Sequence, residues 1–249
     1  MRPYHTEREK RARFSSLRRQ LALLDGSGRA AAVLPFHVAA IDEVLPWGGL
    51  PLGSLHELEG DGADREEGAM PTAFLAGILA RLSPRRPVLW CLTRRDLYAW
   101  GLALYGLAPQ RLILVQASHD EDVLWAMEEG LRNAWLAAVI GEVKVLSPLA
   151  SRRLQLAAET SGIPGFVLNR RLSTVATSAV TRWRIAALPG DSAPSEPGIG
   201  PSRWRVELLR CRGGVPASWD VEASDATGLV SLSTVLADRS AAAQKRIAG

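Results

Sequence analysis

Apolar and polar residues alternate in the central part of the chain as a regular succession of short strands and helices. Continuous apolar runs, which are typical of strands covered on both faces, occur at residues 88–92, 112–115, 137–140 and 166–168. Apolar residues at helical spacing predict helices at 72–82, 96–105, 120–132 and 148–160. Strands that alternate with helices indicate parallel connections, so we predict an α/β fold, a doubly wound and mostly parallel sheet with helices on both faces.

The same pattern predicts which side chains face the core. In the helix at 96–105, Leu97, Trp100 and Leu104 share one side and are expected to face inward. Near the C-terminus, residues 182–186 and 203–208 each contain Arg-Trp-Arg followed by an apolar residue. On a strand, this pattern points Trp183 and Trp204 to one face and the arginines to the other. We therefore predict two adjacent strands that extend the sheet antiparallel at its C-terminal side.

Positive charge is concentrated at the N-terminus. Residues 1–24 contain seven arginines and lysines and two glutamates, so their charge exceeds the formal +4 of the whole chain. Phe14, Leu17 and Leu21 lie at helical spacing there, which favours either a docking arm or a solvated helix. We predict a basic helical arm at 1–33, a core domain at 34–219 and a tail at 220–249 that is partly flexible or binds a partner.

Composition narrows the class of protein. Hydrophobic residues make up 47% and charged residues 22%, which excludes a fibrous or wholly disordered chain. Two cysteines are too few for a disulfide framework and favour a reducing compartment. No apolar run approaches the roughly 18 residues that a membrane span needs. The four histidines are scattered without ligand spacing, so we expect a cytoplasmic protein with no membrane contact and no metal site.

A strand at 54–59, a glycine-rich loop and the helix at 72–82 have the order of a phosphate-binding P-loop. That motif needs G-x-x-x-x-G-K-[ST], in which the lysine neutralises phosphate and the hydroxyl holds magnesium. Here five residues, rather than four, separate Gly62 from Gly68, and the next two residues are neither a lysine nor a serine or threonine. The candidate nucleotide-loop residues are Gly60, Gly62, Gly68, Ala69, Met70 and Thr72. Because phosphoryl transfer depends on positioning and charge neutralisation, we predict no ATPase activity and no cofactor.

The run from Phe36 to Leu58 resembles the segment that leads to the P-loop in RecA-like recombinases. It contains a Leu-Pro-x-Gly turn at 50–53 and a strand that ends in Glu57 and Leu58. The chain is more specifically similar to the ImuA family, the RecA-like accessory proteins of a bacterial SOS mutagenesis cassette. Further similar segments follow in order at 92–116, 152–159 and 203–214, so the resemblance covers about residues 12–235.

The resemblance implies positions where active recombinases carry catalytic acids. The acid expected after the 88–92 strand falls at Arg94, and the magnesium-ordering aspartate falls at Gly141, with Glu142 next to it. The implied function is a non-catalytic adaptor that supports error-prone translesion synthesis, located at the nucleoid during DNA damage. The implied partners are an ImuB-like inactive relative of Y-family polymerases, RecA and an error-prone C-family DNA polymerase, with the segment from Asp220 expected to contact ImuB.

Two alternatives stay open. The first is a single-stranded DNA-binding RecA paralogue with weak nucleotide binding, in which arginines that alternate with tryptophans grip phosphates and stack bases. Its candidate contact residues, for DNA or for a partner, are Arg182, Arg184, Arg203 and Arg205. The second is a cell-division inhibitor similar to SulA, a family that also has a RecA-like core without a working P-loop.

Overall fold

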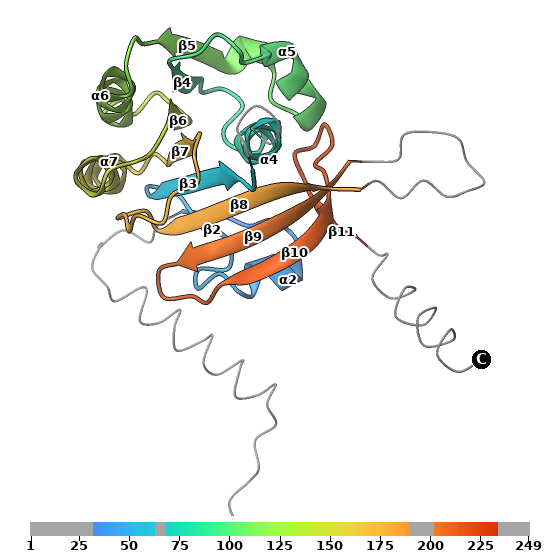
Figure 1. The fold of residues 1–249 in the computed structure, drawn as a ribbon. Coiled ribbons are helices and arrows are strands. Elements are labelled where there is room, and N and C mark those ends of the chain that lie inside the picture. Colours follow the sequence, from blue (N-terminus) through green and yellow to red (C-terminus); the bar gives the residue numbers. More distant parts are fainter. Residues whose placement is uncertain (1–31, 63–67, 190–201, 234–249) are drawn as a thin grey trace, which may run out of the picture.

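In the computed structural model of this chain, the described residues are 32–62, 68–189 and 202–233. Within them, nine strands form one mixed sheet in the order β11-β10-β9-β8-β3-β7-β6-β4-β5 (Figure 1). The parallel strands are β3 (Leu55–Gly60), β4 (Val88–Leu92), β5 (Leu112–Gln116), β6 (Ala138–Val143), β7 (Gly165–Asn169) and β8 (Thr181–Leu188). The antiparallel strands are β9 (Arg203–Cys211), β10 (Ala217–Glu222) and β11 (Ser231–Leu232). The predicted α/β class, mostly parallel sheet and antiparallel extension are confirmed.

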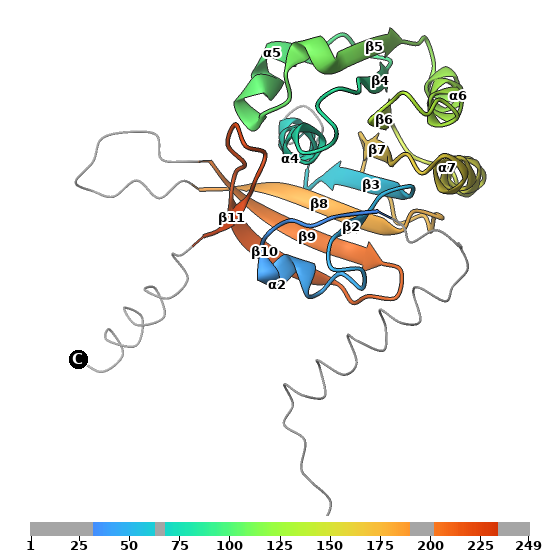
Figure 2. The ribbon, with the colours of Figure 1, turned by 180° about the vertical axis from the view of Figure 1, so that it is seen from behind.

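Helices cover both faces of the parallel strands (Figures 1 and 2). On one face lie α6 (Asp120–Leu131) and α7 (Pro148–Ser161). On the other lie α4 (Ala69–Ala80), α5 (Ala99–Leu102) and the 3-10 turns η1 (Ala103–Tyr105) and η2 (Pro109–Arg111). The short helix α2 (Ala39–Asp42) and a two-stranded sheet of β1 (Val33–Leu34) and β2 (Leu50–Pro51) complete this second layer. None of the helices in the described ranges is both long and apolar enough to cross a membrane.

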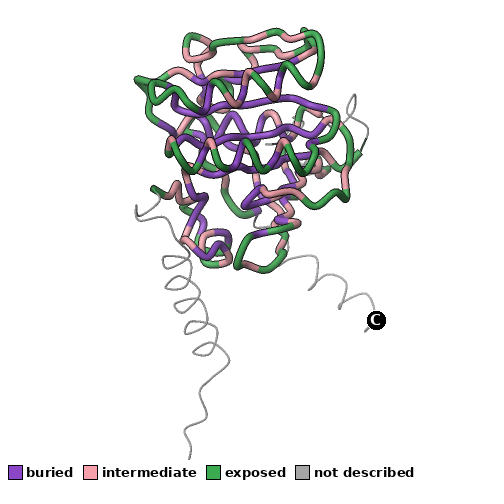
Figure 3. The backbone as a smooth tube through the Cα atoms, turned by 90° about the vertical axis from the view of Figure 1, so that its left-hand side faces the viewer, coloured by how far each residue is buried: buried purple, intermediate pink, exposed green. Residues whose placement is uncertain are grey.

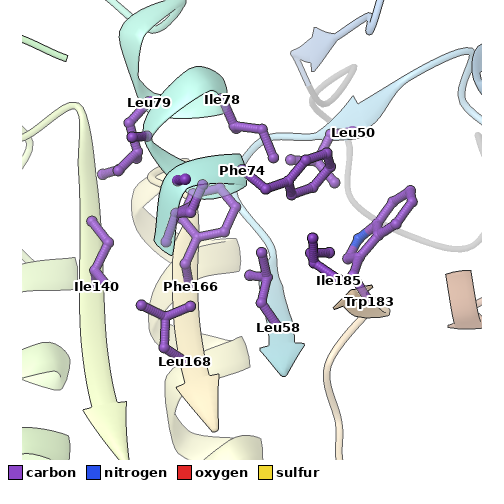
Figure 4. Close-up of a cluster of buried hydrophobic side chains, with 14 of the residues drawn as sticks. Leu50, Leu58, Phe74, Ile78, Leu79, Ile140, Phe166, Leu168, Trp183 and Ile185 are labelled. Carbon is purple, nitrogen blue, oxygen red and sulfur yellow. The ribbon is translucent and has the colours of Figure 1, made fainter. Parts of the chain in front are cut away.

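The core has two parts because successive strand residues point to opposite faces of the sheet. Trp90 belongs to the cluster under α4, whereas the next residue, Cys91, belongs to the cluster under α6, and both are fully buried. In the first cluster the ring of Phe74 lies 6.2 Å from that of Trp183 (Figure 4). It also lies 6.3 Å from the ring of Trp204. Both tryptophans are 1% exposed, so the predicted inward face of the two Arg-Trp-Arg segments is confirmed.

Two helices differ from the sequence prediction. Helix α4 begins at Ala69, three residues before Thr72, because Pro71 occupies a first-turn position whose N–H would have no intrahelical acceptor. The helix expected at 96–105 is only four residues of α-helix followed by η1. Of its predicted inward residues only Leu97 packs against the core, since Trp100 is 65% exposed and Leu104 is 72% exposed, whereas Leu102 is buried.

The C-terminal segment also differs from the expected tail. Residues from Asp220 onward continue β10 and form β11, and Val221 is fully buried. A Cβ at Gly77 of α4 would lie 2.5 Å from the hydroxyl oxygen of Ser224, so this glycine lets the segment approach the helix closely. Residues 220–222 and 231–232 are therefore part of the sheet, and the segment between them lies against α4. At the other end, β1 begins at Val33, inside the range expected for the arm.

Candidate functional site

The candidate nucleotide loop lies at the carboxyl end of β3, where it meets the first turn of α4. Gly60 is the last residue of β3, and Gly68 directly precedes α4. The hollow between them has a volume of about 10 Å³, which is room for roughly one water molecule. It is lined by Gly60, Gly62, Gly68, Pro71, Thr72 and residues 168–172. Residues 63–67, in the middle of the loop, lie outside the described residues.

The first turn of α4 offers little to a phosphate. A helix N-terminus attracts anions through its free backbone N–H groups, but Pro71 removes one of these donors. The Thr72 hydroxyl donates to the carbonyl oxygen of Gly68 at 3.0 Å, so it is engaged inside the helix. Ala69 and Met70 contribute no charge where a P-loop carries its lysine and hydroxyl.

Two arginines that sequence reasoning missed line the same hollow. Arg170 and Arg171 directly follow β7, whose carboxyl end adjoins that of β3. Arg171 is exposed, whereas Arg170 is half-buried and forms an ion pair with Glu142. Asp96, also missed, lies 3.6 Å from Arg170 and 2.5 Å from Arg94. A pair of basic residues directly after an apolar strand was the signal that could have identified them, because parallel strands end at one edge.

The residues at the positions implied for catalytic acids either pack against a helix or pair with other side chains of the chain. Gly141 and Glu142 lie within β6, which continues three residues past the predicted strand end. A Cβ at Gly141 would lie 2.1 Å from the sulfur of Met127 in α6, so the Met127 side chain would have to move before any side chain could occupy this position. Glu142 is 3% exposed, and Trp90 Nε1 donates to its Oε1 at 2.6 Å. Together with Arg170, this indole satisfies both carboxylate oxygens of Glu142.

Glu57 and Glu59 of β3 form a second buried acidic group, on the opposite face of the sheet, and each is 1% exposed. Asn169 Nδ2 donates to Glu57 at 2.8 Å, and the Thr177 hydroxyl donates to its other oxygen. Glu59 accepts hydrogen bonds at 2.8 Å from Arg182 and from Arg184, one on each oxygen. Each buried carboxylate thus has its own charged or polar partners, which is the condition for burying charge without a large penalty.

These pairs change the meaning of the arginines proposed for DNA or partner contact. Arg182 has a side chain only 12% exposed, and it is held between Glu59 and backbone carbonyl oxygens of the β7–β8 loop. Arg205 is exposed and forms two hydrogen bonds with Asp220, which raise the pKa of its guanidinium. Arg203 is half-buried at the start of β9. The two arginines of β8 therefore serve mainly to neutralise Glu59, and this placement does not favour a basic groove for DNA.

His56 stabilises the interior of β3 as a neutral imidazole. It is fully buried, with Nδ1 2.7 Å from the Thr181 hydroxyl and Nε2 2.9 Å from the carbonyl oxygen of Pro51. Trp183 Nε1 donates to the same hydroxyl at 2.8 Å, so the hydroxyl proton is available to donate to Nδ1. Burial lowers the pKa of His56 to about 4, against a weaker opposing effect of the hydrogen bond to Pro51.

Among the described residues, no group of three or more histidine, cysteine, aspartate and glutamate side chains is arranged to hold a metal ion. Both cysteines are buried, and burial raises the pKa of the Cys91 thiol to about 12, so it is not a reactive thiolate. The arm residues Phe14, Leu17 and Leu21 and the loop residues 190–201 lie outside the described residues.

Comparison with known proteins gives one strong similarity. No family model matches the chain. The chain is 39% identical over 213 residues to Protein ImuA in each of two strains of Caulobacter vibrioides, and the match covers 81% of this chain and 87% of each relative. Among solved structures, SulA from Pseudomonas aeruginosa aligns with a TM-score of 0.39 and 24% identity, over 46% of this chain and 96% of SulA.

Proposed function

The chain belongs to the ImuA family, and on that premise we propose that it acts in the SOS mutagenesis cassette as a non-catalytic adaptor with a RecA-like core. In this role it supports error-prone translesion synthesis by contacts with an ImuB-like protein, and RecA and a C-family polymerase are further candidate partners. The parallel sheet, with a glycine loop between β3 and α4, is consistent with a RecA-like ancestry.

The observation that supports a non-catalytic role is that both carboxylate oxygens of Glu142 are paired within the chain. Metal-assisted phosphoryl transfer needs carboxylates and cations that face the nucleotide. Instead, one oxygen of Glu142 accepts a hydrogen bond from Trp90 and the other accepts one from Arg170. At the neighbouring position, Met127 of α6 lies against Gly141. A magnesium ion at Glu142 would have to compete with the Trp90 or the Arg170 contact for a carboxylate oxygen.

Isothermal calorimetry with ATP and ADP in the presence of Mg²⁺ tests this part. We expect no heat of binding at micromolar nucleotide and no phosphate release above buffer. Tight binding with turnover would contradict the proposal directly. The variant Glu142→Gln should change neither result, since this carboxylate is assigned no role in nucleotide chemistry.

A bacterial two-hybrid assay tests the adaptor part separately. We expect a signal with an ImuB-like protein and none with FtsZ, the target expected for a SulA-like division inhibitor. Deletion of residues 234–249 is the appropriate test of the C-terminal contact, because a deletion from Asp220 would also remove Val221 from the core. If the shorter deletion leaves ImuB binding intact, the contact lies elsewhere on the chain.

Weak nucleotide or single-stranded DNA binding is a second candidate, and one observation favours it. Arg171 is exposed and lines the hollow beside the glycine loop, where it can meet a phosphate. Titration of labelled oligonucleotide at low salt, with wild-type protein and Arg171→Ala, measures this contact. A salt-sensitive shift that the substitution abolishes would favour it over the adaptor acting through protein contacts alone.

A further inference from the structure

The parallel half of the sheet ends in an edge strand that lacks the usual protection. Among the described residues, β5 pairs only with β4, so its outer side presents unpaired backbone N–H and C=O groups. Its five residues, Leu112 to Gln116, include no charge and no proline. Natural edge strands generally carry such residues to prevent pairing with other chains. The opposite edge is different, because β11 has only two residues, one of them Ser231.

Large apolar side chains are exposed both on this strand and on the segments at the same end of the molecule. Within β5, Ile113 is 45% and Leu114 is 50% exposed, although both belong to a continuous apolar run. Tyr98, Trp100 and Leu104, at the start of α5 and in η1, are 65–72% exposed. Figures 1 and 2 show β5 and α5 along the same end of the molecule, and in Figure 3 this end is drawn in the colours of exposed and intermediate residues.

The aromatic part of this surface has an ordered arrangement. A Cβ at Gly101 would lie 2.8 Å from Cδ1 of Tyr98, so the tyrosine ring lies directly against the helix at that glycine. At the far end of β5, Arg95 Nε donates to Gln116 Oε1 at 2.5 Å, which holds the strand end. A side chain that is already fixed loses little conformational entropy when a partner covers it.

We propose that this edge is a self-association surface, on which β5 of a second copy pairs antiparallel with β5 across a two-fold axis. The five side chains expose on the order of 600 Å² per copy, so the pairing can bury up to about 1,200 Å², the lower end of the range of specific interfaces. With Leu114 on the two-fold axis, Ile113 opposes Val115 and Leu112 opposes Gln116. The three central positions therefore pair apolar side chains, and no charged residue lies within either strand. This surface is separate from the glycine-loop hollow, so the inference does not depend on the proposed function.

Sedimentation equilibrium of the full chain over 1–100 μM tests the proposal. We expect a concentration-dependent dimer in the wild type. Leu114→Lys places a charge on each edge strand at the centre of the pairing, and should raise the dimer dissociation constant at least about tenfold. Leu149→Lys is the matched control, since Leu149 is 74% exposed on α7 and should leave dimerisation unchanged.

Two results would overturn the proposal. One is a monomer at 100 μM, and the other is a dimer that Leu114→Lys leaves intact. If the wild type is a monomer and the substitution instead abolishes the complex with an ImuB-like protein, the edge belongs to that partner. Far-ultraviolet circular dichroism and an unchanged melting temperature establish that each variant is folded.

Discussion

Two margins of the sheet differ in how their side chains are covered. The first margin consists of the carboxyl ends of β3, β6 and β7, and the second is the outer side of β5. At the first margin, Glu142 and Glu59 are almost completely buried, and each is neutralised by arginines of this chain. At the second, Ile113, Leu114 and Trp100 are apolar and remain uncovered. The first margin is closed within the chain, and the second has surface to share with another molecule.

The two margins also differ in whether their side chains are available to bind another molecule. A carboxylate can bind a metal ion or a substrate directly only where one of its oxygens is accessible. Glu59 is held by arginines of the neighbouring strand β8, and Glu142 by Trp90 of β4 and by Arg170, which directly follows β7. Both carboxylates are therefore occupied by partners within the chain. Exposed apolar surface can be covered without displacing any such partner, and covering it removes apolar area from water.

The largest expected effect comes from breaking the closed margin at Glu59. Glu59→Gln leaves Arg182 and Arg184 without their shared negative charge, and breaking a buried pair in this way costs about 3–5 kcal/mol. Urea denaturation, followed by tryptophan fluorescence, measures the loss. The pair of Arg205 and Asp220 provides the control, because the arginine side chain is 49% exposed and the carboxylate 14% exposed: Asp220→Asn should cost about 1 kcal/mol. Equal losses for the two variants would contradict the distinction between closed and open parts of the sheet.

The next effect is a pH dependence from His56. Its pKa is about 4 in the folded protein and 6.5 as the ordinary value, so the unfolded chain takes up a proton first as pH falls. The contribution is therefore complete above pH 6.5, is lost progressively down to pH 4, and amounts to about 3 kcal/mol in the free energy of unfolding. Comparison of urea denaturation at pH 7, 5.5 and 4 in wild type and His56→Gln isolates this group from the carboxylates. A variant with the wild-type pH slope would show that His56 is not buried as a neutral group.

A smaller effect is expected where α6 closes the position next to Glu142. Gly141→Ala places a methyl group against Met127, and overpacking of this kind costs about 1–3 kcal/mol. In a double-mutant cycle with Met127→Ala, the two substitutions should destabilise less together than the sum of the single changes. Additive losses, measured by thermal denaturation, would mean that the helix does not approach Gly141 as closely as described.

The smallest effect on stability is expected at the open margin. Leu114→Lys replaces a half-exposed side chain, so the monomer's free energy of unfolding should change by less than about 0.5 kcal/mol. Denaturation at a protein concentration too low for association measures this value. A loss of several kcal/mol would show that Leu114 is part of the core and that the two margins do not differ in kind.

Local patterns predicted most of the elements, because an apolar strand or an amphipathic helix is visible in neighbouring residues. Strand β4 agrees with its predicted range at both ends, and α6 differs by one residue. The predictions were wrong where a short segment is held by distant contacts, as in α5, which turns Leu102 inward instead of Trp100. The arm and the tail at 234–249 stay predictions.

The candidate site shows the same division. The glycines of the loop and the absence of a lysine and a hydroxyl after them could be predicted, because they are visible in consecutive residues of the sequence. The partners of Glu59 are more than one hundred residues away, at Arg182 and Arg184, and sequence spacing contains no information about them.

The succession of strands and helices, the inward direction of Trp183 and Trp204, and the lack of a P-loop lysine in the glycine loop could all be predicted from the sequence, since each depends on residues close together in the chain. The pairing of each carboxylate with its arginine, and the position of β5 at the edge, became known from the tertiary structure alone. These depend on the order of strands in the sheet, and that order follows from the packing of the whole molecule.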